Sequence, residues 1–391
     1  ASHTWGQLVQ HQGEWFESAR CTKYHLRSPS IKKLGPDSIH QMRDATGQAR
    51  TTPREISQVL HGFYTSLYAA EEGPDAHEVD QFLDSTIKTR LPTDMAQRLG
   101  APVLASELYE CIQQAARRKS PGPNALPYEI LKLAPAKWAS ALELVFNHAL
   151  FDQTTLTPNQ VQGTTILLHK KGDRDCPANY RPISLINSDV KILTAVLANR
   201  LQPCADLLVH TDQNGFIRGR SIMHNIERLE GLLEYARRYQ PEAAIALLDF
   251  EKAFDRVDHG YLLAVLRKWG LPQRFCTMVQ CLYSGRRSKI LVNGDLSSPF
   301  CIKRGVLQGD PLSPLLFVLA LEPMCLQLRN HAQDGLQIDS TTHVVSCFAD
   351  DSQLFATNEA ALQRQLALVD HFCSLSGFKL NRDKTQVLTH S

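Results

Sequence analysis

Three aspartates are the residues of this chain best suited to chemistry. Asp249 follows the apolar run at residues 243–248, whose composition is typical of a buried strand that carries a carboxylate at its end. Asp350 and Asp351 stand at the tip of a predicted hairpin in a later part of the chain. An isolated Asp-Asp pair is more often a feature of a turn than of a catalytic site. Two adjacent strands of one sheet, however, would bring all three carboxylates together.

Carboxylates held that close repel one another unless a cation lies between them. Oxygen ligands favour Mg²⁺, which keeps several waters and takes further ligands from substrate phosphates. Two such ions roughly 3.5–4 Å apart would stabilise the attacking and leaving oxygens of an in-line phosphoryl displacement. The aspartates therefore predict nucleotidyl transfer that depends on two Mg²⁺ ions.

Seven segments of the chain carry recognisable motifs, and two of them contain the aspartates. They are residues 119–123, 179–185, 213–220, 246–255, 305–317, 348–351 and 377–385. In type and order these motifs resemble those of the reverse transcriptases of non-LTR (LINE-type) retrotransposons, and the resemblance covers roughly residues 100–391.

The resemblance implies an α+β fold, a right-hand polymerase made of fingers and palm. We expect residues 1–100 to be an N-terminal extension or linker, 101–240 the fingers, and 241–391 the palm, with fingers elements interleaved at 260–305. The thumb, which follows the palm in this family, is expected to be missing or truncated. Endonuclease and thumb segments of the same polyprotein are expected partners.

The resemblance also assigns the metal ligands. Asp249 and Asp350 would hold both ions with help from the Phe250 carbonyl, and Asp351 would complete the acidic cluster. A purely structural role for all three aspartates is disfavoured, because strand-end carboxylates without cations would destabilise the fold.

Three residues are expected to contact the incoming nucleotide. By resemblance, Phe254 is the aromatic gate under the sugar, where a ring leaves no room for a 2′-hydroxyl. Gln308 and Gly309 would lie against the nucleotide and the template base, and glycine allows a close backbone approach. The structural alternatives are a core phenylalanine and an ordinary turn before a helix.

Three cations complete the predicted site. By resemblance, Lys170 and Arg181 are fingers residues that would neutralise the triphosphate, and arginine can bind phosphate in a bidentate manner. Lys171 adjoins Lys170, so the choice between these two lysines stays open. Lys384 could donate a proton to the pyrophosphate leaving group. A solvated charge pair and a surface lysine are the alternatives.

The elements that must position these residues can be predicted from periodicity, caps and turn residues. Their order suggests an antiparallel sheet with helices on one side. Expected helices lie within 53–90, with a break at Gly73-Pro74, and at 189–201, 261–269, 313–326 (capped by Ser313) and 360–375. Expected strands are 164–169, 243–248, 288–292, 300–303, 344–348 and 353–356.

Composition excludes several classes of protein. The 391 residues are 43% apolar and 21% charged, which excludes a disordered chain. The apolar run at 315–321 is far too short to span a membrane, and no secretory signal is visible. Ten cysteines without a Cys-x-x-Cys pair indicate reduced thiols and an intracellular location, in the nucleus or cytoplasm or both.

The net charge of only +2 hides an uneven distribution. Residues 267–304 hold eight Lys and Arg residues and one acidic residue, Asp295. This pattern suits a track for a phosphate backbone, and a solvated basic face is the alternative.

These observations favour an RNA-directed DNA polymerase. Its partners would be an RNA template, a DNA primer and deoxynucleoside triphosphates, with no membrane. The alternative is a thumbless, catalytically incompetent remnant that binds RNA. An RNA-directed RNA polymerase is disfavoured, because the Phe254 ring should reject ribonucleotides.

Overall fold

The computed structural model describes residues 38–70, 73–152 and 155–389, so Trp5, Trp15 and Phe16 of the predicted N-terminal extension lie outside it. The chain divides into two compact units. The first unit consists of Ala1–Ser66, Val103–Leu193 and Ser284–Ile302, and the second unit of Leu67–Pro102, Thr194–Tyr283 and Lys303–Ser391. Helices and sheets are present in both, which confirms a mixed helix and sheet fold.

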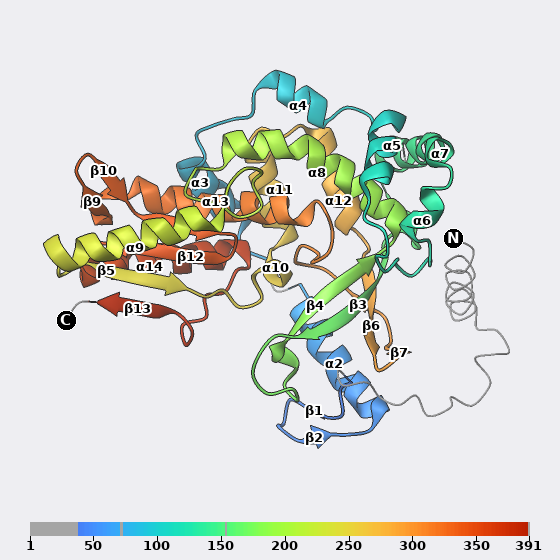
Figure 1. Cartoon of the computed structure of the whole chain (residues 1–391), viewed down its shortest axis with the longest axis horizontal. Helices are drawn as coiled ribbons and strands as arrows, with labels where there is room; N and C mark the ends of the chain where they lie inside the picture. The colour runs from blue at the N-terminus through green and yellow to red at the C-terminus, as the bar shows by residue number, and fades with distance from the viewer. Residues whose placement is uncertain (1–37, 71–72, 153–154, 390–391) are drawn as a thin grey trace, which may run out of the picture. The chain divides into compact units, whose positions relative to one another are not determined.

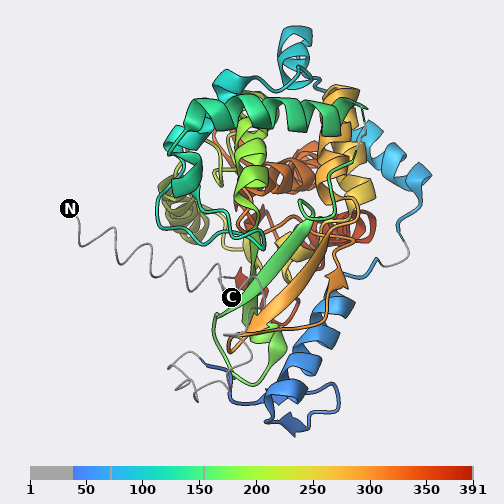
Figure 2. The same ribbon diagram turned by 90° about the vertical axis from the view of Figure 1, so that its right-hand side faces the viewer.

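A sheet ordered β4-β3-β6-β7 organises the first unit, with β8 also paired to β6. Strand β3 is antiparallel to β4 and parallel to β6, and these strands run side by side in green and orange in Figure 2. The strands are β3 (Gln162–His169), β4 (Tyr180–Ile186), β6 (Arg287–Val292), β7 (Asp295–Leu296) and β8 (Phe300–Cys301). A turn at Asn293-Gly294, a residue pair typical of tight hairpins, joins β6 to β7, and both residues have the positive φ that such hairpins require.

The remaining elements of the first unit are a small hairpin and several helices. They are β1 (Met42–Arg43), β2 (Ala49–Arg50), most of α2 (Pro53–Leu67), α5 (Ala105–Gln114), α6 (Tyr128–Leu131), α7 (Pro135–Asn147), η1 (His148–Asp152) and η2 (Pro177–Asn179). Helix α8 (Ser188–Leu208) begins in the first unit and ends in the second.

The second unit contains the strands that carry the predicted chemistry. Its sheet has the order β11-β12-β5-β13, and all neighbouring strands are antiparallel (Figure 1). The strands are β5 (Ala244–Leu248), β11 (Val345–Phe348), β12 (Asp351–Ala356) and β13 (Gln386–Thr389), and a separate hairpin pairs β9 (Leu336–Ile338) with β10 (Thr341–His343).

Helices fill the rest of the second unit. They are α3 (Ala76–Thr86), α4 (Thr93–Leu99), α9 (Ile222–Tyr239), α10 (Ala253–Arg256), α11 (His259–Lys268), α12 (Gln273–Tyr283), α13 (Ser313–Asn330), η3 (Ala332–Asp334) and α14 (Glu359–Ser376). Helix α14 ends at Gly377, whose φ of 80° is the left-handed value that favours glycine there.

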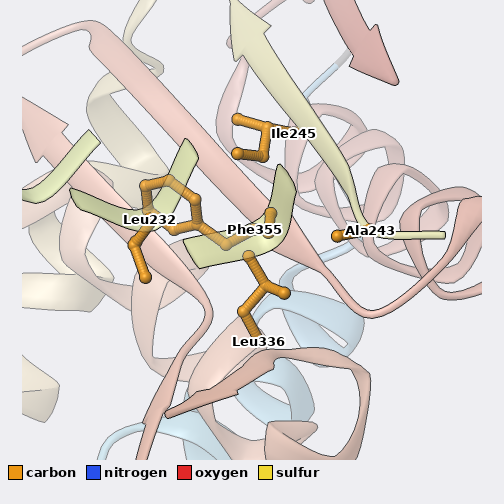
Figure 3. Close-up of a cluster of buried hydrophobic side chains, with 6 residues drawn as sticks. Leu232, Ala243, Ile245, Leu336 and Phe355 are labelled. Carbon is orange, nitrogen blue, oxygen red and sulfur yellow. The ribbon is translucent and has the colours of Figure 1, made fainter. Parts of the chain in front are cut away.

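The core of the second unit lies against its sheet. Leu232 of α9 and Leu336 of β9 pack with Ile245 of β5 and Phe355 of β12, which are register partners on one face (Figure 3). Ala246 and Leu354 point to the opposite face and are also buried. The prediction that helices cover one side of the sheet was therefore wrong, because both faces are covered.

One predicted cap also differs. Ser313 is the first residue of α13 and does not cap it. Its hydroxyl donates to Asp310 Oδ2 at 3.0 Å, so it fixes the loop before the helix.

Candidate active site

The register of β5 and β12 brings two of the predicted aspartates opposite each other. Ser352 pairs with Leu248, and Asp351 and Asp249 are the next residues along this antiparallel ladder. Asp350 lies in the turn between β11 and β12, where Phe348 pairs with Asp351. Asp249 and Asp350 are half-buried and Asp351 is exposed. All three predicted carboxylates therefore lie at one end of a single sheet.

Asn381 holds Asp249 in place. Its side-chain amide donates to Asp249 Oδ2 at 3.0 Å, and its backbone N–H donates to the Asp249 carbonyl at 2.7 Å. A bridge between Phe250 and Leu380 extends the same pairing beyond β5. Asn381 stood in a predicted motif without a role, and only the cross-strand contact shows what it does.

The donor set at this end of the sheet suits a hard cation. In the described part of the chain, no three Asp, Glu, His or Cys side chains are grouped so that they form a complete metal cage. Magnesium does not need one, because it is usually held by one or two carboxylates together with water and substrate phosphates. Asp249 and Asp350, with the Phe250 carbonyl, supply oxygen atoms of the type that Mg²⁺ accepts.

Phe254 lies in a stack of aromatic rings. Its ring is parallel to that of Phe317 on α13, with centroids 4.2 Å apart and an interplanar angle of 5°. A second ring, Phe216, packs edge to face against it, with centroids 5.9 Å apart. Phe254 is half-buried, so its ring is both fixed in orientation and partly accessible.

The loop that carries Gln308 and Gly309 is hydrogen-bonded to, and packs closely against, the segment around Phe254. The Val306 N–H donates to the Phe254 carbonyl at 2.7 Å. A Cβ atom at Gly305 would lie 2.6 Å from the Asp255 carbonyl oxygen, so this close approach requires glycine. Gln308 is half-buried and Gly309 is exposed.

Lys384 lies in the turn between Asn381 and β13. Its backbone N–H donates to the Asn381 carbonyl at 3.2 Å, and β13 then pairs with β5. The side chain of Lys384 is exposed. The same turn thus carries Lys384 and the amide that holds Asp249.

Lys170 and Arg181 belong to the first unit. The Lys170 N–H donates to the Asn179 carbonyl at 2.9 Å, and Arg181 pairs with Leu168 across the β3–β4 hairpin. Both residues are exposed and lie at the same end of this hairpin. Each unit therefore carries some of the predicted site residues.

Residues 168–391 match the reverse transcriptase (RNA-dependent DNA polymerase) family, and every predicted site residue falls in that range. The chain belongs to this family.

Curated relatives of the chain come from mobile elements. It is 30% identical to the transposon TX1 uncharacterized 149 kDa protein of Xenopus laevis, over 86% of this chain and 26% of the relative. It is 29% identical to the retrovirus-related Pol polyprotein from type-1 retrotransposable element R2 of Popillia japonica, over 72% of this chain and 39% of that protein. The RNA-directed DNA polymerase from mobile element jockey of Drosophila melanogaster is 26% identical, over 75% of this chain and 31% of the relative.

These relatives confirm the resemblance to reverse transcriptases of non-LTR retrotransposons. The chain spans less than two fifths of the length of each of them. Among solved structures, an apo telomerase from Candida tropicalis truncated from its C-terminal domain is similar, with a TM-score of 0.46 and 12% identity, covering 67% of this chain and 56% of that one.

The basic block at 267–304 is only partly available to a ligand. Arg286 and Arg304 are buried, and Arg304 Nε donates to the Leu67 carbonyl at 2.7 Å. Lys268 forms an ion pair with Asp84. The prediction of eight cations along one track was therefore wrong for the two buried arginines, because charge counted along a sequence does not show which side chains are buried.

Several cysteines of the described residues are buried. The nine cysteines among these residues are free, and burial raises the pKa of Cys276 to about 11 and that of Cys373 to about 12. Thiols with such pKa values stay protonated and are poor nucleophiles.

In the described part of the chain, no helix has the length and hydrophobicity needed to cross a bilayer.

Proposed function

We propose that this chain extends a DNA 3′ end on an RNA template, as the reverse transcriptase domain of a non-LTR retrotransposon. The observation that carries the proposal is the register of β5 and β12, which places Asp249 beside the Asp350-Asp351 turn in a chain of this family. The substrates would be deoxynucleoside triphosphates, an RNA template and a DNA primer.

Asp249, Asp350 and the Phe250 carbonyl would hold two Mg²⁺ ions, and Asp351 would add negative charge beside them. Bound there, the ions would stabilise the attacking 3′ oxygen and the leaving pyrophosphate oxygen. The protein would supply the fixed geometry, and the hydrogen bond from the Asn381 amide would orient the Asp249 carboxylate for the ions.

Phe254 would select the sugar of the nucleotide. The stack with Phe317 would keep the Phe254 ring from turning aside to admit a 2′-hydroxyl. Gln308 and Gly309 would contact the nucleotide and the template base from the loop fastened to Phe254.

The remaining cations would act on the phosphates. Lys170 and Arg181 would neutralise the triphosphate, and their position at one end of the β3–β4 hairpin supports a shared role. Lys384 would protonate the leaving pyrophosphate, because its exposed amine stands on the turn that also orients Asp249.

The wider architecture is part of the same proposal. Residues 101–240 would form the fingers and 241–391 the palm of a right-hand polymerase, after an N-terminal extension at 1–100. Endonuclease and thumb segments of the same polyprotein would act together with this chain, and a relative that is a Pol polyprotein supports such a context. Since its substrates occur inside cells, we place its activity in the nucleus or cytoplasm.

Primer extension tests the function directly. The 391-residue chain is incubated with an RNA template, an annealed DNA primer, four deoxynucleotides and Mg²⁺, beside Asp350→Asn and the control Asp339→Asn. Asp339 is exposed and lies in the turn between β9 and β10. Extension by the wild type and by the control, but not by Asp350→Asn, would support the proposal.

A folded wild-type chain that binds RNA but does not extend the primer would contradict polymerase activity and favour an RNA-binding remnant. Equal extension by all three proteins would show that the assigned aspartate is not part of the site.

A further inference from the structure

Residues 212–215, a short segment before α9, run along β11. Strand β11 is the outer strand of the hairpin that carries Asp350 and Asp351. The Cys347 N–H donates to the Asp212 carbonyl, and the Asn214 N–H donates to the Cys347 carbonyl, both at 2.8 Å. Gln213 and Cys347 form a parallel bridge at this point. The segment therefore ends directly beside the turn that carries Asp350 and Asp351.

The Gln213 side chain binds the backbone of one turn residue at both of its polar groups. The Ala349 N–H donates to Gln213 Oε1 at 2.8 Å, and Gln213 Nε2 donates to the Ala349 carbonyl at 3.3 Å. The Gly215 N–H donates to the same Oε1 at 2.8 Å. Gln213 is only 1% exposed, so these contacts are shielded from water.

Ala349 needs such support because of its conformation. Its φ is 55°, in the left-handed region that residues other than glycine seldom occupy. A Cβ atom at Gly215 would lie 2.2 Å from the Ala349 nitrogen, so only glycine allows the two backbones to approach this closely. The segment thus encloses the turn residue that immediately precedes Asp350.

The segment is itself held firmly. Arg220 Nη1 donates to the Gln213 carbonyl at 2.9 Å, and Arg220 Nη2 donates to the Val209 carbonyl at 3.0 Å. The buried side-chain amide of Asn225, on α9, donates to two groups of β11, the Cys347 carbonyl at 3.0 Å and Ser346 Oγ at 2.8 Å. Hydrogen bonds therefore hold both the segment that contains Gln213 and the strand β11 that leads to the turn.

We propose that Gln213 is a positioning residue, which holds Ala349 in its left-handed conformation and thereby fixes the direction in which Asp350 and Asp351 point. Gln213 acts through the backbone of the turn and contacts no reacting atom. The proposal rests on the function proposed above and adds to it a residue outside the acidic cluster.

The test replaces the amide and compares two buried glutamines. Gln213→Leu removes all three hydrogen bonds and replaces the amide by an apolar side chain of similar size. Gln365→Leu is the matched control, because Gln365 is also buried and its Nε2 donates to the Phe355 carbonyl at 3.0 Å, toward the other end of β12. Gln213→Glu keeps an oxygen that can accept from Ala349 and Gly215.

The first measurement is hydrogen exchange of the backbone amides in the metal-free chain. We expect the Ala349 amide to exchange at least about 10-fold faster in Gln213→Leu than in the wild type, while β5 amides behave as in the control. Gln213→Glu should restore slow exchange at Ala349, which a general loss of stability would not do.

The second measurement is steady-state primer extension. Gln213→Leu should lower kcat roughly 10- to 100-fold, because a small misplacement of catalytic groups is costly, and leave the KM for nucleotide within about threefold. Exchange and kcat that match those of Gln365→Leu would overturn the proposal. If the wild type extends no primer, the proposed function fails, and exchange at Ala349 alone decides whether Gln213 holds the turn.

Discussion

At the scale of single residues, the candidate site depends on a few hydrogen bonds that orient charged groups. The contact between the Asn381 amide and Asp249 is the clearest, because it joins a half-buried carboxylate to a neighbouring turn. A neutral donor in this position leaves the other carboxylate oxygen available to a cation. Loss of the hydrogen bond from Asn381 should therefore lower the rate of the reaction more than it lowers the stability of the fold.

We expect Asn381→Ala to lower kcat for primer extension about 10-fold and the free energy of unfolding by only about 1 kcal/mol. Steady-state kinetics and urea unfolding measure the two effects. Asn330→Ala, at an exposed position at the end of α13, is the control and should change neither. A kcat equal to that of the wild type would show that Asn381 does not orient Asp249.

The ring stack around Phe254 leads to a prediction about sugar selectivity. Phe254→Ala should raise the ratio of ribonucleotide to deoxynucleotide kcat/KM about 10-fold or more, because the ring that excludes the 2′-hydroxyl is gone. Phe254→Tyr retains a ring and should keep the wild-type ratio. The ratio is measured by single-nucleotide insertion, and an unchanged value in Phe254→Ala would exclude a gating role.

The choice between Lys170 and Lys171 can also be tested. The Lys170 backbone is hydrogen-bonded to Asn179, so its side chain starts from a fixed point near Arg181. Lys170→Ala should raise the KM for deoxynucleotide about 10-fold, and Lys171→Ala should change it less than about threefold. The reverse order would assign the triphosphate contact to Lys171.

At the scale of elements, an ionic cluster joins α9 and α13 to the loop after α8. The Asp212 carboxylate pairs with Arg228 of α9 and, at 3.3 Å, with Arg329 of α13. Arg329 also pairs at 2.9 Å with Glu322, which is fully buried. Since the Asp212 carbonyl accepts from Cys347, this cluster supports the strand that leads to Asp350.

The cluster should make stability depend on pH. Burial acts to raise the pKa of Asp212, but the hydrogen bond from His210 and the charges of Arg228, His210 and Arg329 outweigh it and hold this pKa well below its usual range. A carboxyl whose pKa is lowered by folding stabilises the protein above its unfolded pKa of about 3.9, and this contribution is lost as the pH falls below that value.

We therefore expect Asp212→Asn to lower the free energy of unfolding at pH 7 by about 2–3 kcal/mol, because it removes the carboxylate that Arg228 and Arg329 share. Urea unfolding should give the same difference at pH 5 and a smaller one below about pH 4. Asp339→Asn makes the same change at an exposed position and should have little effect. A difference that does not vary down to pH 3 would contradict this account.

At the scale of the whole molecule, the net charge of +2 provides little long-range attraction for nucleic acid. RNA binding must then depend on exposed cations in particular places. With roughly three to four phosphate contacts, affinity for single-stranded RNA should fall roughly 20- to 50-fold between 50 and 200 mM salt. Fluorescence anisotropy measures this slope. An oligomer with an uncharged backbone should show none, and an RNA affinity independent of salt would exclude a phosphate track.

Several features could be predicted from the sequence because they depend on residues close together in the chain. The apolar run before Asp249, the hairpin that carries Asp350 and the stop of α14 at Gly377 all follow from local composition and backbone preference. Helix α9 was not predicted, although Ser221 caps it and its apolar residues follow helical spacing. Strand β13 gave no such signal, because its four residues are exposed and only pairing with β5 defines it.

The sequence alone determined the family and the identity of the carboxylates, since motif residues and their order are written in the chain. Tertiary structure decided the rest. The register that aligns Asp249 with Asp351, the amide of Gln213 around Ala349 and the burial of Arg286 and Arg304 join residues that are far apart in sequence. Such contacts depend on the packing of whole elements, so no local pattern specifies them.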